Sequence, residues 1–308
     1  MSKLRTISRM VISVLAAGIL FAGCTEKKEA ETTEEKNETM NVQVDTVKTD
    51  EFTMDYCRFG NGKKVFVAIP GLSVQSIMPS AEAIAEAYKV MADEYTLYFF
   101  DRRKDHPDTY SIDDMAKDTA AAVRALGIEQ ADFFGASQGG MIALKIAIND
   151  PELVHKLILG SSSACVGEEQ YRKIGEWVGL AKAGDAKGLY LSFGEAVYPA
   201  EVYENSKEML ESAAATVTKE ELESFAVIAE AADGFDVSDQ LGTITQPVLV
   251  IGSEDDRVLG GDASRKIAEG LKNSSHCELY MYDGYGHAVY DLAPDYKERM
   301  LKFLLAEE

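Results

Sequence analysis

The stretch from Asp132 to Leu144 constrains the fold of this chain more than any other. An apolar run ends here in glycines around Ser137 and continues at once as an amphipathic segment that contains alanine. This pattern predicts a strand, a very tight turn and a helix, with Ser137 at the apex of the turn. Side chains at Gly135 or Gly139 would collide with the neighbouring strand and helix. Ser137 is therefore expected to leave the sheet with its hydroxyl at a helix amino terminus.

Strand-like and helix-like segments alternate on both sides of this turn. The expected strands are residues 64–69, 95–100, 133–135, 156–160, 247–252 and 277–282, and the expected helices are residues 79–91, 111–126, 138–148, 262–271 and 290–306. Residues 42–48 and 51–58 alternate between apolar and polar side chains, which predicts an antiparallel hairpin. Ser111 and Asp114 form a capping-box pattern at one helix start. The alternation predicts an α/β fold with a mostly parallel central sheet and helices on both faces.

Between Ser161 and Asp239 the alternation stops. Helix-like stretches follow one another there without a convincing strand, and they cover residues 168–183, 185–197, 201–217 and 219–232. This region, at about residues 162–239, is therefore predicted to be a helical insertion.

Chain length and net charge limit the possible domain organisation and the possible partners of this protein. A chain of 308 residues with 46% hydrophobic content suits one large α/β domain with an insertion, which we favour over two smaller domains. The formal net charge of −21 would repel phosphate backbones over most of the surface. No nucleic-acid partner is therefore expected.

The amino terminus resembles a bacterial lipoprotein signal peptide. Basic residues precede an apolar run over residues 10–22, which is too short to span a bilayer comfortably, and the run closes on Phe21-Ala22-Gly23-Cys24. Small residues before a cysteine resemble the lipobox, although Phe21 stands where leucine is usual. The resemblance implies cleavage after residue 23, lipidation of Cys24 and a lipid-anchored protein on the extracytoplasmic side of the bacterial cell membrane. An ordinary cleaved signal and an uncleaved anchor are the alternatives.

Residues 24–41 are expected to form an acidic disordered tether between that anchor and a folded domain at 42–308. Glutamate, lysine and threonine dominate the segment, so it cannot bury enough apolar surface to offset the entropy of ordering. The remaining cysteines, Cys57, Cys165 and Cys277, are too widely spaced for a disulfide framework or a metal cluster. They are expected to be small buried side chains, although one pair could bridge.

A serine hydroxyl needs a nearby base to become a nucleophile, and Gly-x-Ser-x-Gly alone can be a chance match. Active groups gather at the carboxyl ends of parallel strands. His155 and His276 precede their strands and so lie at the wrong edge. His287 follows its strand in a glycine-flanked loop and is our candidate general base for Ser137. His106 also follows a strand, and we expect it in an exposed loop rather than lining the pocket.

A series of short motifs runs from residue 41 to the end of the chain. These motifs are Pro70-Gly71-Leu72, Asp101-Arg102-Arg103, Leu126-Gly127-Ile128, Gly135 to Gly140, Pro151-Glu152, Gly252 to Val258 and Gly284-Tyr285-Gly286-His287. Their order resembles that of the α/β-hydrolase family. The resemblance implies an α/β-hydrolase fold in which the helical insertion acts as a cap over the site.

The resemblance also implies the acid that orients the base. The pattern Gly-x-x-Asp-x-x-Val places Asp255 where the family has its triad aspartate. Its neighbour Asp256 is the chief competitor and is expected to be solvated. The chain order Ser137, Asp255, His287 is the order expected for this fold.

Two backbone N–H groups are candidates for holding an oxyanion. The N–H of Gln138 lies in the first turn of a helix, where it has no intrahelical partner. The resemblance adds the N–H of Leu72, although this chain has Pro70-Gly71 where many relatives have His-Gly.

These residues together predict a membrane-tethered serine hydrolase that cleaves a carboxylic ester or related acyl bond of a small-molecule substrate. Ser137 would attack the carbonyl, His287 would move the proton and Asp255 would fix the imidazole. No metal or organic cofactor is implied, and the sequence leaves protein partners unknown. The aromatic residues of the insertion that could line a pocket are Trp177, Tyr190, Phe193, Tyr198 and Tyr203.

Two other classes of function stay open. The same triad supports amide or peptide hydrolysis of the aminopeptidase type, in which Glu168 or Glu195 of the insertion could bind a substrate amine. A hydrolase-like binding lipoprotein without catalytic activity is the second alternative.

Overall fold

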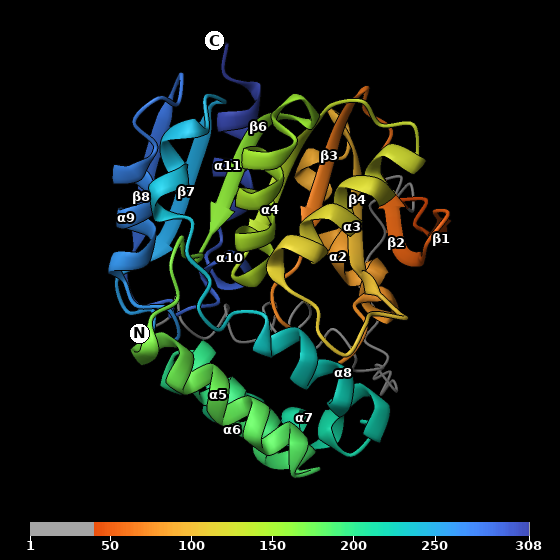
Figure 1. The fold of residues 1–308 in the computed structure, drawn as a ribbon, viewed down its shortest axis with the longest axis vertical. Coiled ribbons are helices and arrows are strands. Elements are labelled where there is room, and N and C mark those ends of the chain that lie inside the picture. The colour runs from red at the N-terminus through yellow and green to blue at the C-terminus, as the bar shows by residue number, and fades with distance from the viewer. Residues whose placement is uncertain (1–39, 308) are drawn as a thin grey trace, which may run out of the picture.

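The computed structural model describes residues 40–307, and the strands of this part form one sheet in the order β1-β2-β4-β3-β5-β6-β7-β8 (Figure 1). The expected hairpin is confirmed, because β1 (Gln43–Lys48) pairs antiparallel with β2 (Thr53–Phe59). β2 also runs antiparallel to β4. The other strands pair in parallel: β3 (Lys64–Ile69), β4 (Tyr95–Arg103), β5 (Ala131–Ala136), β6 (Val154–Gly160), β7 (Val248–Ser253) and β8 (Cys277–Tyr282). The prediction of a mostly parallel sheet is confirmed.

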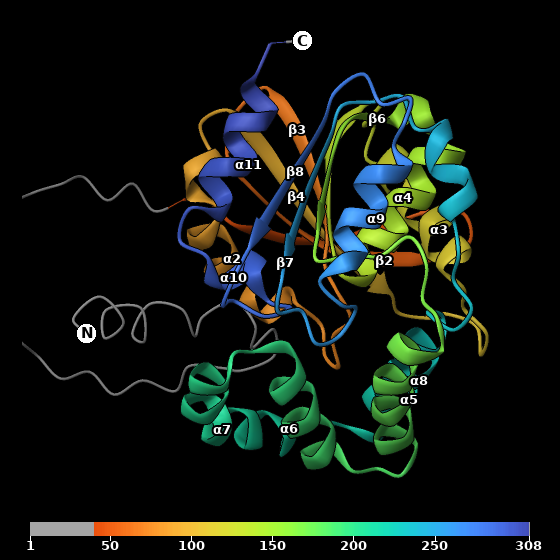
Figure 2. The same cartoon turned by 90° about the vertical axis from the view of Figure 1, so that its left-hand side faces the viewer.

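Helices cover both faces of this sheet (Figure 2). One face carries α2 (Ala81–Ala87), α10 (Val289–Leu292) and α11 (Tyr296–Leu305), and the other carries α3 (Ile112–Ala125), α4 (Gln138–Asn149) and α9 (Asp262–Gly270). Short 3-10 helices span Met78–Ser80, Lys89–Met91, Pro151–Leu153 and Ser238–Thr243. The helix expected over residues 79–91 is thus α2 with a 3-10 turn at each end.

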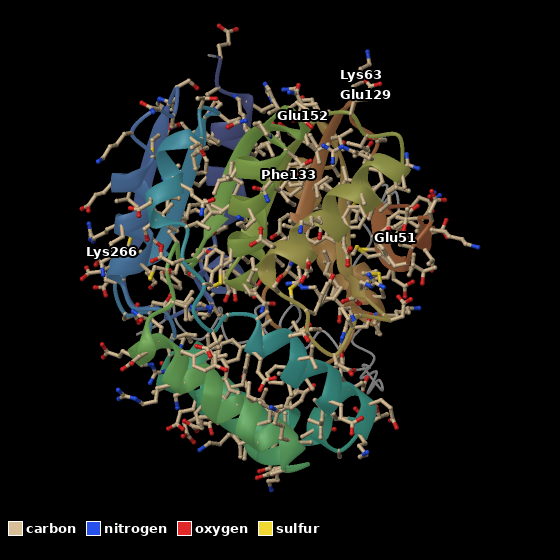
Figure 3. All side chains as sticks on the ribbon, viewed as in Figure 1. Glu51, Lys63, Glu129, Phe133, Glu152 and Lys266 are labelled. Carbon is tan, nitrogen blue, oxygen red and sulfur yellow. The ribbon has the colours of Figure 1, made fainter. Side chains whose placement is uncertain are left out.

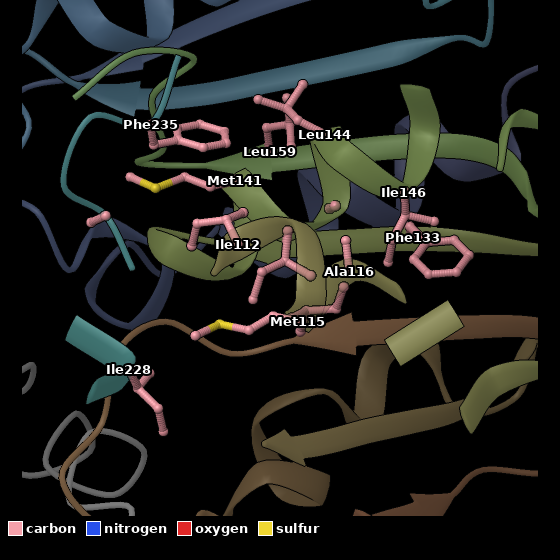
Figure 4. Close-up of a cluster of buried hydrophobic side chains, with 14 of the residues drawn as sticks. Ile112, Met115, Ala116, Phe133, Met141, Leu144, Ile146, Leu159, Ile228 and Phe235 are labelled. Atoms are coloured by element: carbon pink, nitrogen blue, oxygen red, sulfur yellow. The ribbon is translucent and has the colours of Figure 1, made fainter. Parts of the chain in front are cut away.

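The two faces bury separate hydrophobic cores because successive side chains of a strand point in opposite directions. Phe133 of β5 belongs to the core on the side of α3 and α4, which also includes Met115 and Met141 (Figure 4). The next residue, Phe134, packs on the opposite face beside Tyr296 of α11. Both rings are buried, which explains why β5 from Phe133 onward reads as a continuous apolar run rather than an alternating one.

Two helix ends show how well local signals predicted the structure. The capping box at Ser111 and Asp114 is confirmed, with the Ser111 hydroxyl accepting a hydrogen bond from the Asp114 N–H at 3.1 Å. The single closing helix expected over residues 290–306 is wrong. Pro294 lies between α10 and α11, where its ring and missing N–H interrupt the helix.

Four cap helices lie between β6 and β7 in the described part of the chain, close to the expected ranges. We call α5 (Glu168–Lys182), α6 (Ala186–Val197), α7 (Ala200–Ala214) and α8 (Lys219–Glu230) the cap. The cap covers the edge where the parallel strands end (Figures 1 and 2). Figure 3 shows Lys63, Glu129 and Glu152, which precede β3, β5 and β6, at the opposite edge of the sheet.

Polar contacts join the cap to loops of the sheet. The Gln75 side chain, in the segment after β3, donates to Glu221 of α8 at 3.3 Å and accepts from the Tyr190 hydroxyl of α6 at 3.0 Å. His106, in the loop after β4, lies with Nε2 2.7 Å from the Ser224 hydroxyl of α8. The loop that carries His106 therefore contacts the cap.

The proposed signal peptide, Cys24 and nearly all of the tether lie outside the described residues. Within residues 40–307, no helix has the length and apolar character needed to cross a membrane. Cys57, Cys165 and Cys277 are free thiols. The expectation that they are buried is right for Cys57 and wrong for the other two. Cys165 is exposed and forms an isolated β-bridge with Asp236, and Cys277 is exposed on β8 at the edge of the sheet.

We expect Gly139→Ala to lower the free energy of unfolding by at least about 2 kcal/mol, because the added methyl group would overlap the carbonyl oxygen of Ile69 at the end of β3. Gly179→Ala is the matched control, since a methyl group there, inside α5, meets no described atom within 4 Å. The free energy of unfolding of this control is expected to rise by up to about 1 kcal/mol, because alanine favours a helix more than glycine does. Urea unfolding measures both, and equal stability of the two variants would contradict the packing argument.

Candidate active site

Ser137 lies at the apex of the turn between β5 and α4, as predicted. Its φ of 52° is positive, which is rare for a residue with a side chain, so the turn is strained. The Ser137 N–H donates to the carbonyl of Gly160 at the end of β6 at 2.8 Å. The need for glycine at Gly135 and Gly139 is confirmed, because a methyl group at either position would overlap backbone atoms. At Gly71 such a group would lie 3.2 Å from the Ser137 Cβ.

His287 lies beside Ser137, as predicted. Its Nε2 is 2.8 Å from the Ser137 hydroxyl oxygen, and the imidazole is only 2% exposed. The loop that carries it after β8 contains Gly284 and Gly286, whose φ values of 82° and 65° suit glycine. At Gly286 a side chain would also press on the carbonyl of Val197 at the end of α6.

The carboxylate that meets the imidazole is Asp256, so the prediction that Asp255 takes this place is wrong. Asp256 Oδ2 lies 2.8 Å from His287 Nδ1. Its other oxygen, Oδ1, accepts hydrogen bonds from the N–H groups of Val258 at 2.8 Å and Leu259 at 3.0 Å. Asp256 is 8% exposed, so it is also not the solvated neighbour that the sequence suggested.

Asp255 instead holds the loop that carries His287. Its carboxylate accepts hydrogen bonds from the N–H groups of Gly284 and Gly286, each at 3.1 Å. The Ser253 hydroxyl donates to the same carboxylate at 2.6 Å. The two adjacent aspartates therefore have different roles. Asp256 contacts the imidazole, and Asp255 fixes the backbone of the loop that carries it.

The environment of Asp256 keeps its carboxyl group ionised. Burial acts to raise the pKa of Asp256, but the nearby His287 ring and the N–H groups of Leu259 and Val258 outweigh it and hold this pKa below its ordinary value. An ionised Asp256 requires His287 to carry a proton on Nδ1. The Nε2 atom then faces the Ser137 hydroxyl as an acceptor, which is the arrangement of a general base.

Both predicted oxyanion residues lie at the site. Leu72 and Gln138 line a small cavity of about 30 Å³ together with Ser137 and His287. Gln138 is the first residue of α4, so its N–H belongs to the helix end that lacks intrahelical partners. The positive end of the α4 dipole therefore also points to this cavity.

A second cavity, of about 140 Å³, adjoins the first, because Leu72, Phe193 and Tyr290 line both. The predicted cap aromatics Trp177, Tyr190, Phe193 and Tyr198 each line one or both cavities, whereas Tyr203 packs under the ammonium of Lys207. The exposed residues Glu168 and Glu195, proposed to bind an amine, are absent from the described linings of both cavities. In residues 40–307 no cluster of three or more His, Cys, Asp or Glu side chains is arranged to hold a metal ion.

Comparison with known proteins assigns the family. The sequence profile described as serine aminopeptidase, S33, matches residues 93–291. The chain belongs to this family. It is an α/β-hydrolase enzyme, which confirms the fold that the order of motifs implies.

Curated relatives of this chain are named for the hydrolysis of carbamates and of enol-lactones. RutD of Rhizobium rhizogenes, a candidate carbamate hydrolase, is 29% identical over 72% of this chain and 87% of its own length. The 3-oxoadipate enol-lactonase 2 of Acinetobacter baylyi is 27% identical over 70% of this chain and 80% of its own. Among solved structures, the α/β-hydrolase MGS-M2 from a deep-sea metagenome library has a TM-score of 0.77 at 22% identity, covering 86% of this chain and 98% of its own. That structural likeness shows the shared fold.

The sequence reasoning missed a role for Arg102. Its guanidinium donates to the carbonyl of Pro70 at 2.8 Å and to the Gln138 side-chain oxygen at 3.3 Å. The Gln138 amide in turn donates to the carbonyl of Ile228 in α8 at 2.7 Å. Arg102 thus ties the Leu72 loop to Gln138, and Gln138 ties both to the cap. Its position in the Asp-Arg-Arg motif at the end of β4, at the carboxyl edge of the sheet, was the available signal.

We expect Asp256→Asn to lower the turnover of a p-nitrophenyl ester by about 10⁴-fold, because the amide would favour the wrong imidazole tautomer. Asp255→Asn is the matched control, and it is expected to lose far less because its amide oxygen can still accept from the Gly284 or Gly286 N–H. Steady-state kinetics on folded protein measures both. A larger loss for Asp255→Asn would reverse the assignment.

Proposed function

We propose that this protein is a serine hydrolase that cleaves a carboxylic ester or related acyl bond of a small-molecule substrate. The observation that carries the proposal is the continuous chain from the Ser137 hydroxyl through His287 to Asp256, with 2.8 Å at each step. A partly buried serine hydroxyl beside a buried, carboxylate-oriented imidazole is the arrangement that activates a nucleophile. The names of the relatives, with lactone and carbamate substrates, support an ester-type bond.

The geometry gives each residue a step. His287 Nε2 takes the hydroxyl proton as the Ser137 oxygen attacks the carbonyl carbon, and Asp256 stabilises the imidazolium that forms. The N–H groups of Leu72 and Gln138 then donate to the oxyanion of the tetrahedral intermediate, where one such donor is worth about 3 kcal/mol. His287 passes the proton to the leaving alcohol. Water then attacks the carbonyl of the acyl enzyme while His287 Nε2 takes its proton. When this second tetrahedral intermediate collapses, the bond to the Ser137 oxygen breaks, that oxygen takes the proton back from His287, and the free acid leaves.

We expect the wild-type protein to hydrolyse p-nitrophenyl esters faster than aminoacyl p-nitroanilides. Ser137→Ala should lower ester hydrolysis by at least about 10³-fold, since the nucleophile is gone. A fluorophosphonate probe should label the wild-type protein at Ser137. Preference for the anilides would favour the aminopeptidase alternative, and failure of the folded protein to react with the probe would favour a binding protein.

The proposal includes a location for the enzyme. The basic, apolar and small-residue pattern before Cys24 supports a lipid anchor on the extracytoplasmic side of the bacterial membrane. A tether of residues 24–41 would leave the folded domain free to meet small substrates.

We expect the full-length protein, expressed in a bacterium, to incorporate labelled palmitate and to sediment with membranes. Cys24→Ser should abolish the label because the thiol that accepts the lipid is lost. Cys57→Ser is the control, since this thiol is buried in β2. Equal labelling of the Cys24→Ser variant would reject the anchor without bearing on the catalytic proposal.

A further inference from the structure

The larger cavity beside Ser137 combines apolar walls with a single charged side chain. Aliphatic and aromatic side chains from the sheet, α2 and the cap form most of its lining, and Asp291 of α10 is the one charged residue among the described residues that line it. Three lining residues, Leu72, Phe193 and Tyr290, also face the small cavity at Ser137. A substrate held at Ser137 can therefore extend one of its ends toward Asp291.

Within residues 40–307, the Asp291 carboxylate accepts no hydrogen bond and pairs with no cation. The positive charge that acts on Asp291 is Lys297 of α11, and it does so through space rather than by an ion pair. The Lys297 ammonium instead donates to the backbone carbonyl of Tyr290 and lies 5.1 Å from the centroid of the Tyr88 ring. The protein thus leaves this partly buried carboxylate, which borders the cavity, without the partner that a charge removed from bulk water requires.

The surroundings of Asp291 suit a cation more than a second anion or a neutral group. Burial raises the pKa of Asp291 to about 6, and Lys297 opposes that rise, so the carboxylate is mostly ionised at pH 7 to 8. Aromatic rings, whose faces attract cations, line the same cavity. The net charge of −21 further favours the approach of cations over anions.

We propose that Asp291 binds a protonated amine, so that the cavity selects substrates in which an apolar chain or ring ends in an ammonium group. This rests on the proposed function only in placing the scissile bond at Ser137. A cavity of this volume holds a group of about six carbons, because an engineered apolar cavity of about 150 Å³ binds benzene. The ammonium forms a charge-assisted hydrogen bond with the carboxylate, which a hydroxyl would match only weakly.

The selectivity follows the ionisation of Asp291. Its carboxylate is charged above a pH of about 6 and neutral below it, so the preference for an amine is present at high pH and is lost as pH falls. The other titratable groups that face Asp291 are Tyr88, Tyr198, Tyr290, Tyr296 and Lys297. Burial raises the pKa of each of these tyrosines well above its ordinary value, so they stay neutral over the same range.

Binding to the full-length Ser137→Ala variant tests the proposal without turnover. The ligands are n-hexylamine, n-hexanol and hexanoate, which share an apolar chain and differ at its end, and calorimetric titration gives each Kd. At pH 8 we expect hexylammonium to bind at least about 10-fold more tightly than hexanol, the ratio that one charge-assisted hydrogen bond supplies. Hexanoate should bind most weakly. Hexylamine is protonated throughout the range from pH 8 to pH 5. A fall in its binding advantage over hexanol within that range therefore reports on the protein.

Adding Asp291→Asn should abolish the advantage of the amine over the alcohol, whereas adding Glu298→Gln should preserve it. Glu298 is exposed on α11, beside Lys297, so this control makes the same change in net charge outside the cavity. Equal binding of amine and alcohol, or an advantage that survives Asp291→Asn, overturns the proposal. If the Asp291 variant does not fold, an advantage unchanged between pH 8 and pH 5 overturns it instead. Failure of the ester panel would reject the proposed hydrolysis and leave this binding result intact.

Discussion

The strained turn at Ser137 is the constraint on which the rest of the structure depends. A residue with a positive φ of 52° costs about 1–3 kcal/mol, and it persists only where its surroundings leave no alternative. Here β5 and α4 are almost entirely buried on either side of the turn, so the chain cannot relax without exposing both. Glycine at Gly135 and Gly139 lets the strand, the helix and the end of β3 approach closely enough to enclose it. The packing of the core thereby fixes the position of one hydroxyl group.

The same edge of the sheet assembles the other functional groups from distant parts of the sequence. Because parallel strands end together, the loops after β3, β5, β7 and β8 bring Leu72, Ser137, Asp256 and His287 to one place. Hydrogen bonds to the backbone hold two of these groups in addition to the contacts between them. Asp256 is fixed by two N–H groups of its own loop, and the loop of His287 is fixed by Asp255. The imidazole therefore has little freedom to leave the serine.

Periodicity predicted the sheet, the flanking helices and the cap helices from sequence, because each depends on local patterns of apolar residues. The sequence could not decide which way individual side chains point within a loop. Asp255 and Asp256 are neighbours of identical type, and only the path of the backbone after β7 determines which one faces His287. Arg102 and Asp291 were missed for a related reason, since their roles come from segments far away in the chain. The break at Pro294, in contrast, was readable from the sequence and was overlooked.

The cap contacts the site in two ways that use different helices. α8 reaches the oxyanion side through the Ile228 carbonyl, a backbone atom that accepts from Gln138 whatever side chain Ile228 carries. α6 instead supplies side chains, with Tyr190 and Phe193 on the wall of the larger cavity. Changes of sequence in α6 can therefore reshape the substrate cavity while the hydrogen bond from α8 remains. Because Phe193 lines both cavities, however, a change at that position alters the space at Ser137 as well as the space near Asp291. Phe193 is thus the cap residue at which substrate shape and the geometry of the reacting groups are hardest to separate.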